Sequence, residues 1–133
     1  MVKLEGTVLE KEYLAAMDFV KAQLRMCDCR LSKRFGRDYI MMITGRIKTP
    51  ESIEKKLLQK GMVPGTELAV KELHDIAGLR VVCNYIEDIY QLRNEIYNNS
   101  GLQMVKEKDY IFRPKKSGYR SLVHEYYEYK NKQ

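Results

Sequence analysis

The sequence predicts an α+β fold in which helices flank a β-sheet, and three observations support this prediction. Apolar residues recur every three or four positions over about residues 5–34, which indicates a long amphipathic helix. Two short apolar runs, Tyr39–Ile43 and Leu79–Cys83, are typical of strands, and the second is predicted to be buried. A second helical period over Ile86–Tyr97 leads into a strand-like segment at 103–112, which gives a β-α-β order.

The length and composition of the chain favour one domain with an anionic partner. A chain of 133 residues is long enough for a single domain over 1–133, with a sheet-containing core at about 38–129. Charged residues make up 32% and hydrophobic residues 44% of the chain, as in ordinary soluble proteins. The net charge of +6 and the pI near 9.2 favour a nucleotide, a nucleic acid or an acidic surface as partner.

The sequence contains no signal for a membrane or a secreted location. No apolar run approaches the length needed to cross a bilayer, and the N-terminal residues lack the apolar core of a signal peptide. The three cysteines form neither an even disulfide set nor a C-x-x-C pair, so we expect a reduced, cytoplasmic protein. We expect Cys27-Asp28-Cys29 on a helix surface and Cys83 in the core. Zinc is not expected, because the two histidines lack metal-site spacing with the cysteines.

The segment 39–48 gives the first indication of a function. Strand alternation in its second half places Arg46 and Lys48 on one face and Ile47 on the other. Two cations side by side repel each other unless an anion lies between them. This strand face is therefore a candidate binding site for a phosphate group.

A helix is predicted directly after this strand. Thr49-Pro50 supplies a capping residue and a proline suited to the first helical position, and Gly61 marks the end of the helix. Ser52 and Lys56 are four residues apart and therefore share one helix face. Residues 67–73 are predicted to form a further short helical turn.

Asp75 stands just before the central strand Leu79–Cys83, and Gly78 lies between them. A carboxylate at the mouth of a strand, beside a glycine that permits close approach, suits a divalent metal that carries phosphates. A structural alternative is that Asp75 caps a turn and Arg80 pairs with a surface acid.

The densest functional pattern is the loop Arg113–Leu122. In the strand before it, alternation points Lys106 and Lys108 the same way. The loop holds four cations within eight residues around Tyr119, so a base could stack on the ring while the cations hold phosphates. The alternative is a solvated basic turn. The tail from Val123 onward is predicted to form one more strand.

Four motifs follow one another along the chain. They are Gly45-Arg-Ile-Lys48 with Ser52 and Lys56, Asp75-Ile-Ala-Gly-Leu-Arg80, Lys108-Asp-Tyr-Ile111, and Pro114-Lys115 with Gly118-Tyr-Arg-Ser-Leu122. In order and spacing they resemble the synthetase domain of the RelA/SpoT-type alarmone synthetases, and most of all the small synthetase-only members. This resemblance implies a nucleotidyltransferase-like fold with a mixed β-sheet flanked by helices. It also implies GTP pyrophosphokinase activity, in which pyrophosphate passes from ATP to the 3′-hydroxyl of GTP or GDP to give (p)ppGpp in the stringent response.

The resemblance also assigns roles to individual residues. The residues that match the ATP-phosphate motif are Arg46, Lys48, Ser52 and Lys56. Asp75 matches the catalytic ligand of Mg²⁺, and Arg80 its companion in the strand. The residues that match the GTP side are Lys108, Lys115 and Tyr119, with the tyrosine stacking on guanine. Clustered cations and a metal ion are what phosphoryl-type transfer needs for positioning and charge neutralisation.

The last part of the chain departs from the family pattern. Val123 occupies the position of the family's histidine, and His124 follows one residue later, which on a strand changes the face. The family's Glu-x-Gln-x-Arg-Thr strand has no counterpart here, so Glu125 and Glu128 are candidates only by proximity. We therefore expect a chain that is truncated relative to the family, binds nucleotides and has weak or no synthetase activity.

Other functions remain open. A non-catalytic module that binds single-stranded RNA, or that binds nucleotides in a regulatory role, would also use the net charge and Tyr119. Asp75 discriminates between a Mg²⁺-dependent enzyme and a non-catalytic RNA-binding module, because an acid in a phosphate-binding surface is useful only when Mg²⁺ bridges it. A homo-oligomer is compatible with the resemblance. Alarmone hydrolysis is not expected, because His74 and His124 are too few for a metal site of that type.

Overall fold

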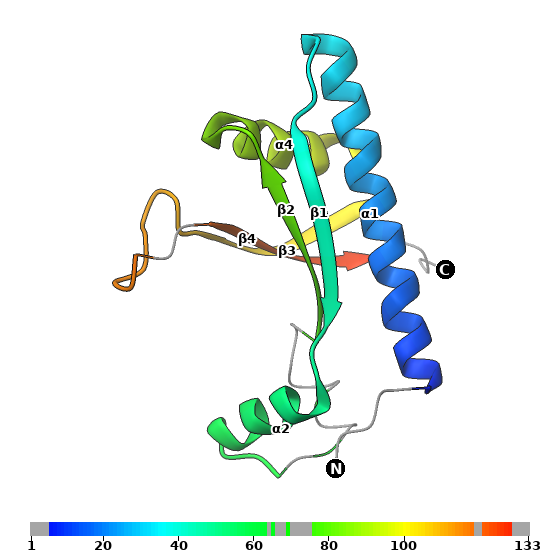
Figure 1. Ribbon diagram of the computed structural model, residues 1–133, viewed down its shortest axis with the longest axis vertical. Helices are drawn as coiled ribbons and strands as arrows, with labels where there is room; N and C mark the ends of the chain where they lie inside the picture. Colours follow the sequence, from blue (N-terminus) through cyan, green and yellow to red (C-terminus); the bar gives the residue numbers. More distant parts are fainter. Residues whose placement is uncertain (1–5, 64, 66–68, 70–75, 119–120, 129–133) are drawn as a thin grey trace. The chain divides into compact units, whose positions relative to one another are not determined.

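The computed structural model describes residues 6–63, 65, 69, 76–118 and 121–128, with the backbone alone at 103–106 and 123–128. In chain order its elements are α1 (Val8–Phe35), β1 (Ile40–Ile47), α2 (Pro50–Gln59), β2 (Ala77–Cys83), α4 (Ile86–Asn99), β3 (Leu102–Asp109) and β4 (Leu122–Glu128), as Figure 1 shows. This order confirms the α+β class. The chain groups into two compact units, Met1–Lys21 with Met42–Val81, and Ala22–Met41 with Val82–Gln133.

The ends of α1 and α2 lie where the local sequence predicts them. α1 ends at Phe35, and Gly36 follows with a positive φ of 78° while its amide donates to the Ser32 carbonyl at 2.8 Å. A left-handed glycine directly after the last helical residue is a common helix terminus. At the start of α2 the Thr49 hydroxyl accepts from the Ser52 amide at 3.2 Å, so Thr49 is the capping residue that the sequence predicts.

Strands β1 and β2 form an antiparallel pair that α1 covers on one face. The Lys48 amide donates to the Ile76 carbonyl at 2.6 Å, so the end of β1 lies beside the start of β2 (Figure 1). A Cβ atom at Gly45 would lie 2.6 Å from Met17 Cε and 2.7 Å from Leu79 Cδ2. Only glycine therefore fits between the strand and the Met17 side chain of α1 without a rearrangement.

The prediction of a buried strand at Leu79–Cys83 was wrong in its burial. In β2, Gly78 and Arg80 are exposed, and the other residues are partly buried. Residues on a strand alternate between two faces, and Leu79 points toward the same side as Gly45 and Met17. The strand is therefore half-buried, with one face against α1 and one face exposed.

The hydrophobic core of the first unit fixes α2. Ile53 and Leu57 are fully buried, and they form a cluster with Ala69 and Ile76. Partly buried apolar residues that pack against this cluster are Leu9, Tyr13, Ile47 and Met62. Residues 53 and 57 are one helical turn apart, so a single stripe of α2 is anchored in the core.

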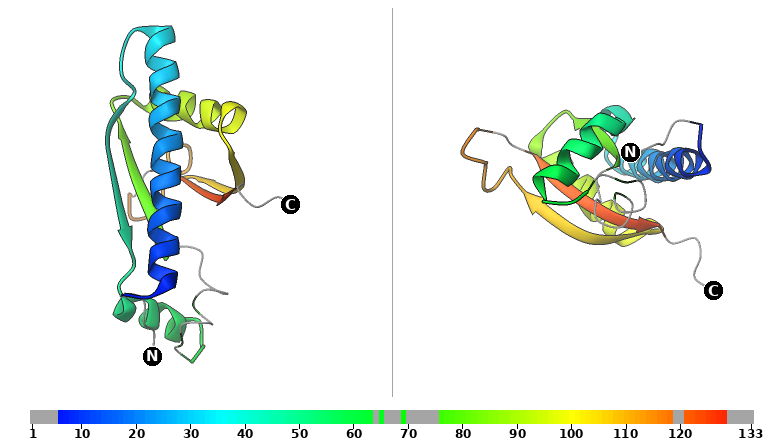
Figure 2. Two further views of the ribbon diagram at one scale, coloured as in Figure 1. Left: turned by 90° about the vertical axis from the view of Figure 1, so that its right-hand side faces the viewer. Right: turned by 90° about the horizontal axis from the view of Figure 1, so that it is seen from below.

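Strands β3 and β4 pair antiparallel in the second unit (Figure 2). Asp109 pairs with Leu122 and Leu102 with Glu128, which confirms the strand predicted in the tail. The strand predicted to run to Phe112 ends earlier, at Asp109. The Asp109 carboxylate accepts hydrogen bonds from the amides of Ile111 and Phe112, and these bonds turn the chain.

The prediction of a surface location for Cys27-Asp28-Cys29 was right only for Cys29. Cys27 is fully buried and Asp28 is 9% exposed. The Asp28 carboxylate accepts hydrogen bonds from the Tyr39 and Ile40 amides at 2.8 and 3.2 Å. A buried carboxylate that accepts from two backbone amides is satisfied, which explains how an acid can occupy the inner face of α1.

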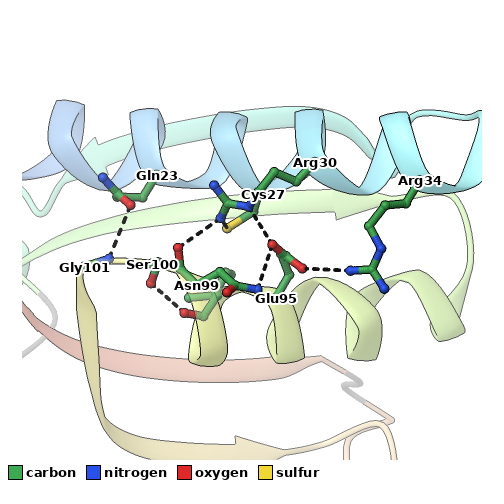
Figure 3. A network of polar contacts seen from close by, with 9 residues as sticks. Gln23, Cys27, Arg30, Arg34, Glu95, Asn99, Ser100 and Gly101 are labelled. Carbon is green, nitrogen blue, oxygen red and sulfur yellow. Dashed lines mark hydrogen bonds and ion pairs between the residues drawn. The ribbon is translucent and has the colours of Figure 1, made fainter.

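A second buried acid, Glu95 of α4, joins this helix to α1. Arg30 donates to the Glu95 carboxylate at 2.6 Å, and Arg34 lies 3.7 Å from its other oxygen. Arg30 also donates to Cys27 Sγ and to the Asn99 carbonyl, at 3.2 and 3.1 Å (Figure 3). Hydrogen bonds and ion pairs from Arg30 and Arg34 thus join the two helices. None of the helices in the described part of the chain is both long enough and apolar enough to span a bilayer.

The three thiols should differ in reactivity. Iodoacetamide at pH 8 should modify exposed Cys29 first. Burial, reinforced by the carboxylates of Asp88 and Asp28, raises the pKa of Cys83 from 9.0 to about 11, so its thiolate fraction falls by about 100-fold. Burial also raises the pKa of Cys27. Mass spectrometry of labelled peptides over time measures the order of modification. Cys29 and Cys83 should react at equal rates in urea, and equal rates in the folded protein would contradict the prediction.

Candidate functional site

The first unit presents two arginines on the exposed face of the β1–β2 pair. Gly45 and Leu79 face α1, so the residues next to them in sequence, Arg46 and Arg80, belong to the opposite face. Both arginine side chains are exposed. The structure therefore brings the first and second motifs onto one sheet face, where two planar guanidinium groups can meet an oxyanion.

Lys48 lies directly after β1, two residues beyond Arg46. Its amide is tied to the Ile76 carbonyl, which fixes the backbone at the point where the strand ends. The lysine side chain is partly buried. Because Thr49 caps α2 immediately afterwards, hydrogen bonds at Lys48 and Thr49 hold the connection between β1 and α2.

Ser52 and Lys56 lie along α2, each directly before a fully buried residue. Ile53 and Leu57 anchor the helix in the core, and a step of one residue turns the helix by about 100°. Ser52 and Lys56 therefore form a stripe beside the buried one, where Ser52 is exposed and Lys56 is partly buried. The predicted residues Arg46, Lys48, Ser52 and Lys56, with Arg80, all belong to the same compact unit.

The predicted metal ligand Asp75 lies outside the described residues. Of the helical turn predicted at 67–73, only Ala69 is described; it is helical, and its amide donates to the Gly65 carbonyl at 3.0 Å. Arg46, Lys48, Lys56 and Arg80 are cations, and a cation is not a ligand for Mg²⁺. No group of three or more histidine, cysteine, aspartate or glutamate side chains that could hold a metal is found among the residues whose placement is described. A Mg²⁺ site at Asp75 therefore stays a prediction.

The second unit contains the residues predicted for the guanine nucleotide. Lys108 is exposed near the end of β3, and its cross-strand partner in β4 is Val123. His124 pairs with Glu107 instead. Neighbouring residues on a strand belong to opposite faces, so the register position of His124 is on the face opposite to that of Lys108.

The loop after β3 exposes the remaining cations. Arg113 and all residues from 114 to 118 are exposed, and Lys115 Nζ lies 4.9 Å from the centre of the Tyr110 ring. The Gly118 amide donates to the Lys115 carbonyl at 2.8 Å, and Gly118 has a positive φ of 89° that favours glycine. The predicted stacking residue Tyr119 lies outside the described residues.

Tyr90 is connected to this loop, although it is not among the residues predicted from the sequence. The Tyr90 hydroxyl of α4 donates to the Asp109 carboxylate at 2.6 Å. This hydrogen bond raises the pKa of Tyr90 and is the main reason why the pKa of Asp109 is lowered. Asp109 stands inside the quoted motif, whereas nothing in the local sequence marks Tyr90.

Comparison with known proteins places these features in a family. Residues 45–133 match the family described as "Region found in RelA / SpoT proteins". The GTP pyrophosphokinase YwaC of Bacillus subtilis is 37% identical over 83% of this chain and 52% of the relative. The GTP pyrophosphokinase YjbM of the same species is 31% identical over 82% of this chain and 50% of the relative.

Solved structures give the same result. Small alarmone synthetase 2 from Bacillus subtilis has a TM-score of 0.69 at 36% identity, over 83% of this chain and 54% of that chain. Small alarmone synthetase 1 from the same species, bound to its product pppGpp, has a TM-score of 0.70 at 29% identity, over 83% and 55%. These matches confirm the resemblance and the fold class expected from the sequence. The chain spans about half the length of the curated relatives it matches.

Proposed function

Because this chain belongs to the RelA/SpoT family of GTP pyrophosphokinases, we propose that it binds ATP and a guanine nucleotide for transfer of pyrophosphate to the 3′-hydroxyl of GTP or GDP. The observation that carries this proposal is the cationic surface of the first unit. Arg46 and Arg80 share the exposed face of the strand pair, and Lys48 continues it toward α2.

The ATP side of the proposal follows from charge and anchoring. A triphosphate needs several positive groups held in place, and guanidinium forks bind phosphate oxygens in pairs while lysine acts as a point charge. Lys56 and Ser52 are carried by a helix whose neighbouring stripe, Ile53 and Leu57, is fully buried. Binding therefore requires little ordering of the backbone, which reduces its entropic cost.

The guanine side uses the second unit. Lys108 on β3 and Lys115 in the exposed loop supply charge for the phosphates of GTP or GDP, and Tyr119 supplies an aromatic ring for the base. Small alarmone synthetase 1 from Bacillus subtilis has been solved bound to its product pppGpp, a guanine nucleotide, which supports a ligand of this class.

Mg²⁺ is part of the proposal through Asp75. When bound, Mg²⁺ would neutralise charge on the phosphate oxygens. In the transfer, the 3′-oxygen of the acceptor bonds to the β-phosphorus of ATP, the bond from that phosphorus to the α,β-bridging oxygen breaks, and AMP leaves. Arg46, Lys48 and Lys56 would hold the ATP phosphates for that displacement.

The proton of the 3′-hydroxyl needs an acceptor, and here the chain departs from the family pattern. Val123, across from Lys108, carries no titratable group, and His124 stands at the next position, across from Glu107. General base assistance contributes about 10²–10⁴-fold to such reactions. Nucleotide binding is therefore the property that these residues support best, and turnover should be weak.

Lys48→Ala tests the ATP side. Removing one charge-assisted contact, typically about 1.5–3 kcal/mol, should weaken ATP binding by about ten- to a hundredfold in the presence of Mg²⁺. Isothermal titration calorimetry of ATP into the wild type and the variant measures this ratio. The matched control is Lys55→Ala, which removes the same charge from an exposed position on α2.

Two results of this titration would reject the proposal. One is equal ATP affinity in the wild type, Lys48→Ala and Lys55→Ala. The other is a chain that binds neither ATP nor GDP but binds a single-stranded RNA oligomer with steep salt dependence, which would favour the RNA-binding alternative.

A further inference from the structure

Asp109, the last residue of β3, uses both oxygens of its carboxylate. Oδ1 accepts from the amides of Ile111 and Phe112, each at 2.9 Å, and Oδ2 accepts from the Tyr90 hydroxyl at 2.6 Å. The backbone carbonyl of Asp109 also accepts from the Arg113 amide at 3.2 Å. One residue thus organises the first turn of the loop at 110–118.

The two oxygens have different functions in the structure. The contacts of Oδ1 are local and form the turn that ends the strand. The contact of Oδ2 comes from α4, nineteen residues earlier in the chain, and fixes the orientation of the carboxyl group relative to that helix. Rotation of the carboxyl group would break the local contacts, so the Tyr90 hydroxyl also stabilises the turn.

Tyr90 is itself held in place. The guanidinium of Arg93 lies 5.0 Å from the centre of the Tyr90 ring, and it donates to both oxygens of Glu107, at 3.3 and 3.1 Å. Glu107 and Asp109 belong to β3, while Tyr90 and Arg93 belong to α4. The four side chains form a chain of contacts, from Glu107 through Arg93 and Tyr90 to Asp109, between the helix and the end of the strand.

The turn determines where the loop cations are presented. The Tyr110 amide, directly after Asp109, donates to the Ser121 carbonyl at 2.7 Å, and Lys115 Nζ lies over the Tyr110 ring. The direction in which residues 110–112 leave the strand therefore sets the path of the exposed residues that include Lys115. Neither Tyr90 nor Asp109 matches a position to which the family resemblance assigns a nucleotide.

We propose that the hydrogen bond from Tyr90 to Asp109 is a positioning device that holds the loop at 110–118 in the geometry that binds the guanine nucleotide. Tyr90 acts through Asp109 and does not touch the nucleotide. This inference rests on the proposed function, since it concerns the residues proposed there to bind the guanine nucleotide.

Tyr90→Phe tests the inference because it removes one hydroxyl and keeps the ring under Arg93. We expect the affinity for GDP to fall by about three- to tenfold, the effect of one net hydrogen bond, while the affinity for ATP changes by less than about twofold. Isothermal titration calorimetry with each nucleotide and Mg²⁺ measures both. The matched control is Tyr97→Phe, which alters an exposed tyrosine on the same helix.

A second readout reports the position of the loop without any nucleotide. Limited trypsin digestion, followed by mass spectrometry, gives the cleavage rate after Lys116. This rate should rise severalfold in Tyr90→Phe relative to the wild type and Tyr97→Phe, because the loop is less restrained. Asp109→Asn keeps a side-chain oxygen for the local turn, and Tyr90→Phe in that background should have a smaller further effect.

The outcomes separate this inference from the proposed function. If the wild type binds GDP and Tyr90→Phe binds it equally well with unchanged cleavage after Lys116, the positioning role is refuted and the proposed function stands. If Tyr90→Phe weakens ATP and GDP alike and lowers the melting temperature, Tyr90 is a structural residue and the inference fails. If the wild type binds neither nucleotide, both fail.

Discussion

Replacing Leu57 with alanine should lower the free energy of unfolding by about 2–5 kcal/mol, the range for a leucine truncated in a packed core. Leu57 is fully buried and packs in the cluster with Ile53, Ala69 and Ile76. A loss of this size is a large part of the total stability of an ordinary domain. It should also reduce ATP affinity, because the same helix carries Ser52 and Lys56.

The next residue provides a matched control. Leu58 is 61% exposed, so Leu58→Ala makes the same chemical change without leaving a cavity. Its effect on unfolding should stay within about 0.5 kcal/mol. Urea unfolding followed by circular dichroism compares the two variants, and similar losses of stability in both would show that α2 is not anchored by the stripe described above.

Replacing Asp88 with alanine should lower the free energy of unfolding by about 3 kcal/mol at neutral pH. Asp88, in the first turn of α4, is fully buried and receives two hydrogen bonds from Arg37, at 2.9 and 2.6 Å. The Arg37 guanidinium also lies 4.2 Å from the Tyr39 ring centre. We expect the lower end of the range for breaking a buried ion pair, because Arg37 is 43% exposed and can be rehydrated.

The pH dependence of this loss has a definite sign. The hydrogen bonds from Arg37 lower the pKa of Asp88 from its ordinary value of 3.8. The stabilisation is therefore complete above that value and is lost as pH falls through the lower pKa of the folded state. In thermal unfolding, the difference between the wild type and Asp88→Ala should therefore be full from neutral pH down to about 3.8 and should shrink only below that value.

Glu87→Ala serves as the control for Asp88→Ala. Glu87 is an exposed acid in the same helical turn, so this variant loses the same charge near the N-terminus of α4 without breaking a buried pair. A loss equal to that of Asp88→Ala, or a difference that does not shrink in acid, would mean that the Arg37 contact contributes little.

Most of the element order could be predicted because its signals are local. Thr49 and Pro50 begin α2, and glycines with positive φ follow α1 and α2, at Gly36 and Gly61. These signals depend on the backbone preferences of a few neighbouring residues, so they can be recognised from the local sequence alone. The end of β3 was placed three residues too late, because the hydrogen bonds of Asp109 to two later amides compete with continuation of the strand.

The buried acids could not be predicted, because their partners are distant in sequence. Asp88 depends on a residue 51 positions earlier and Glu95 on one 65 positions earlier. An isolated aspartate or glutamate in a helix is ordinarily exposed, and only the tertiary structure brings the cation that makes burial tolerable.

The cations of the candidate site could be predicted from the sequence, but the contacts that hold them in place could not. Alternation along the strand predicts that Arg46 and Lys48 share one face. The structure adds Arg80 to that face, because Gly45 and Leu79, the residues before Arg46 and Arg80, lie together on the opposite one. The resemblance supplied the roles of Lys108 and Lys115. The contact of Tyr90 with Asp109 depends on the packing of α4 against β3, which no periodicity in the sequence encodes.

The carboxylate of Asp28 has a consequence for the order in which the chain folds. Its two amide partners lie only eleven and twelve residues further along, and closing a short loop costs less conformational entropy than closing a long one. During synthesis from the N-terminus, these partners become available before Asp88 and Glu95 have been made. We therefore expect the junction of α1 and β1 to form before the contacts of α4.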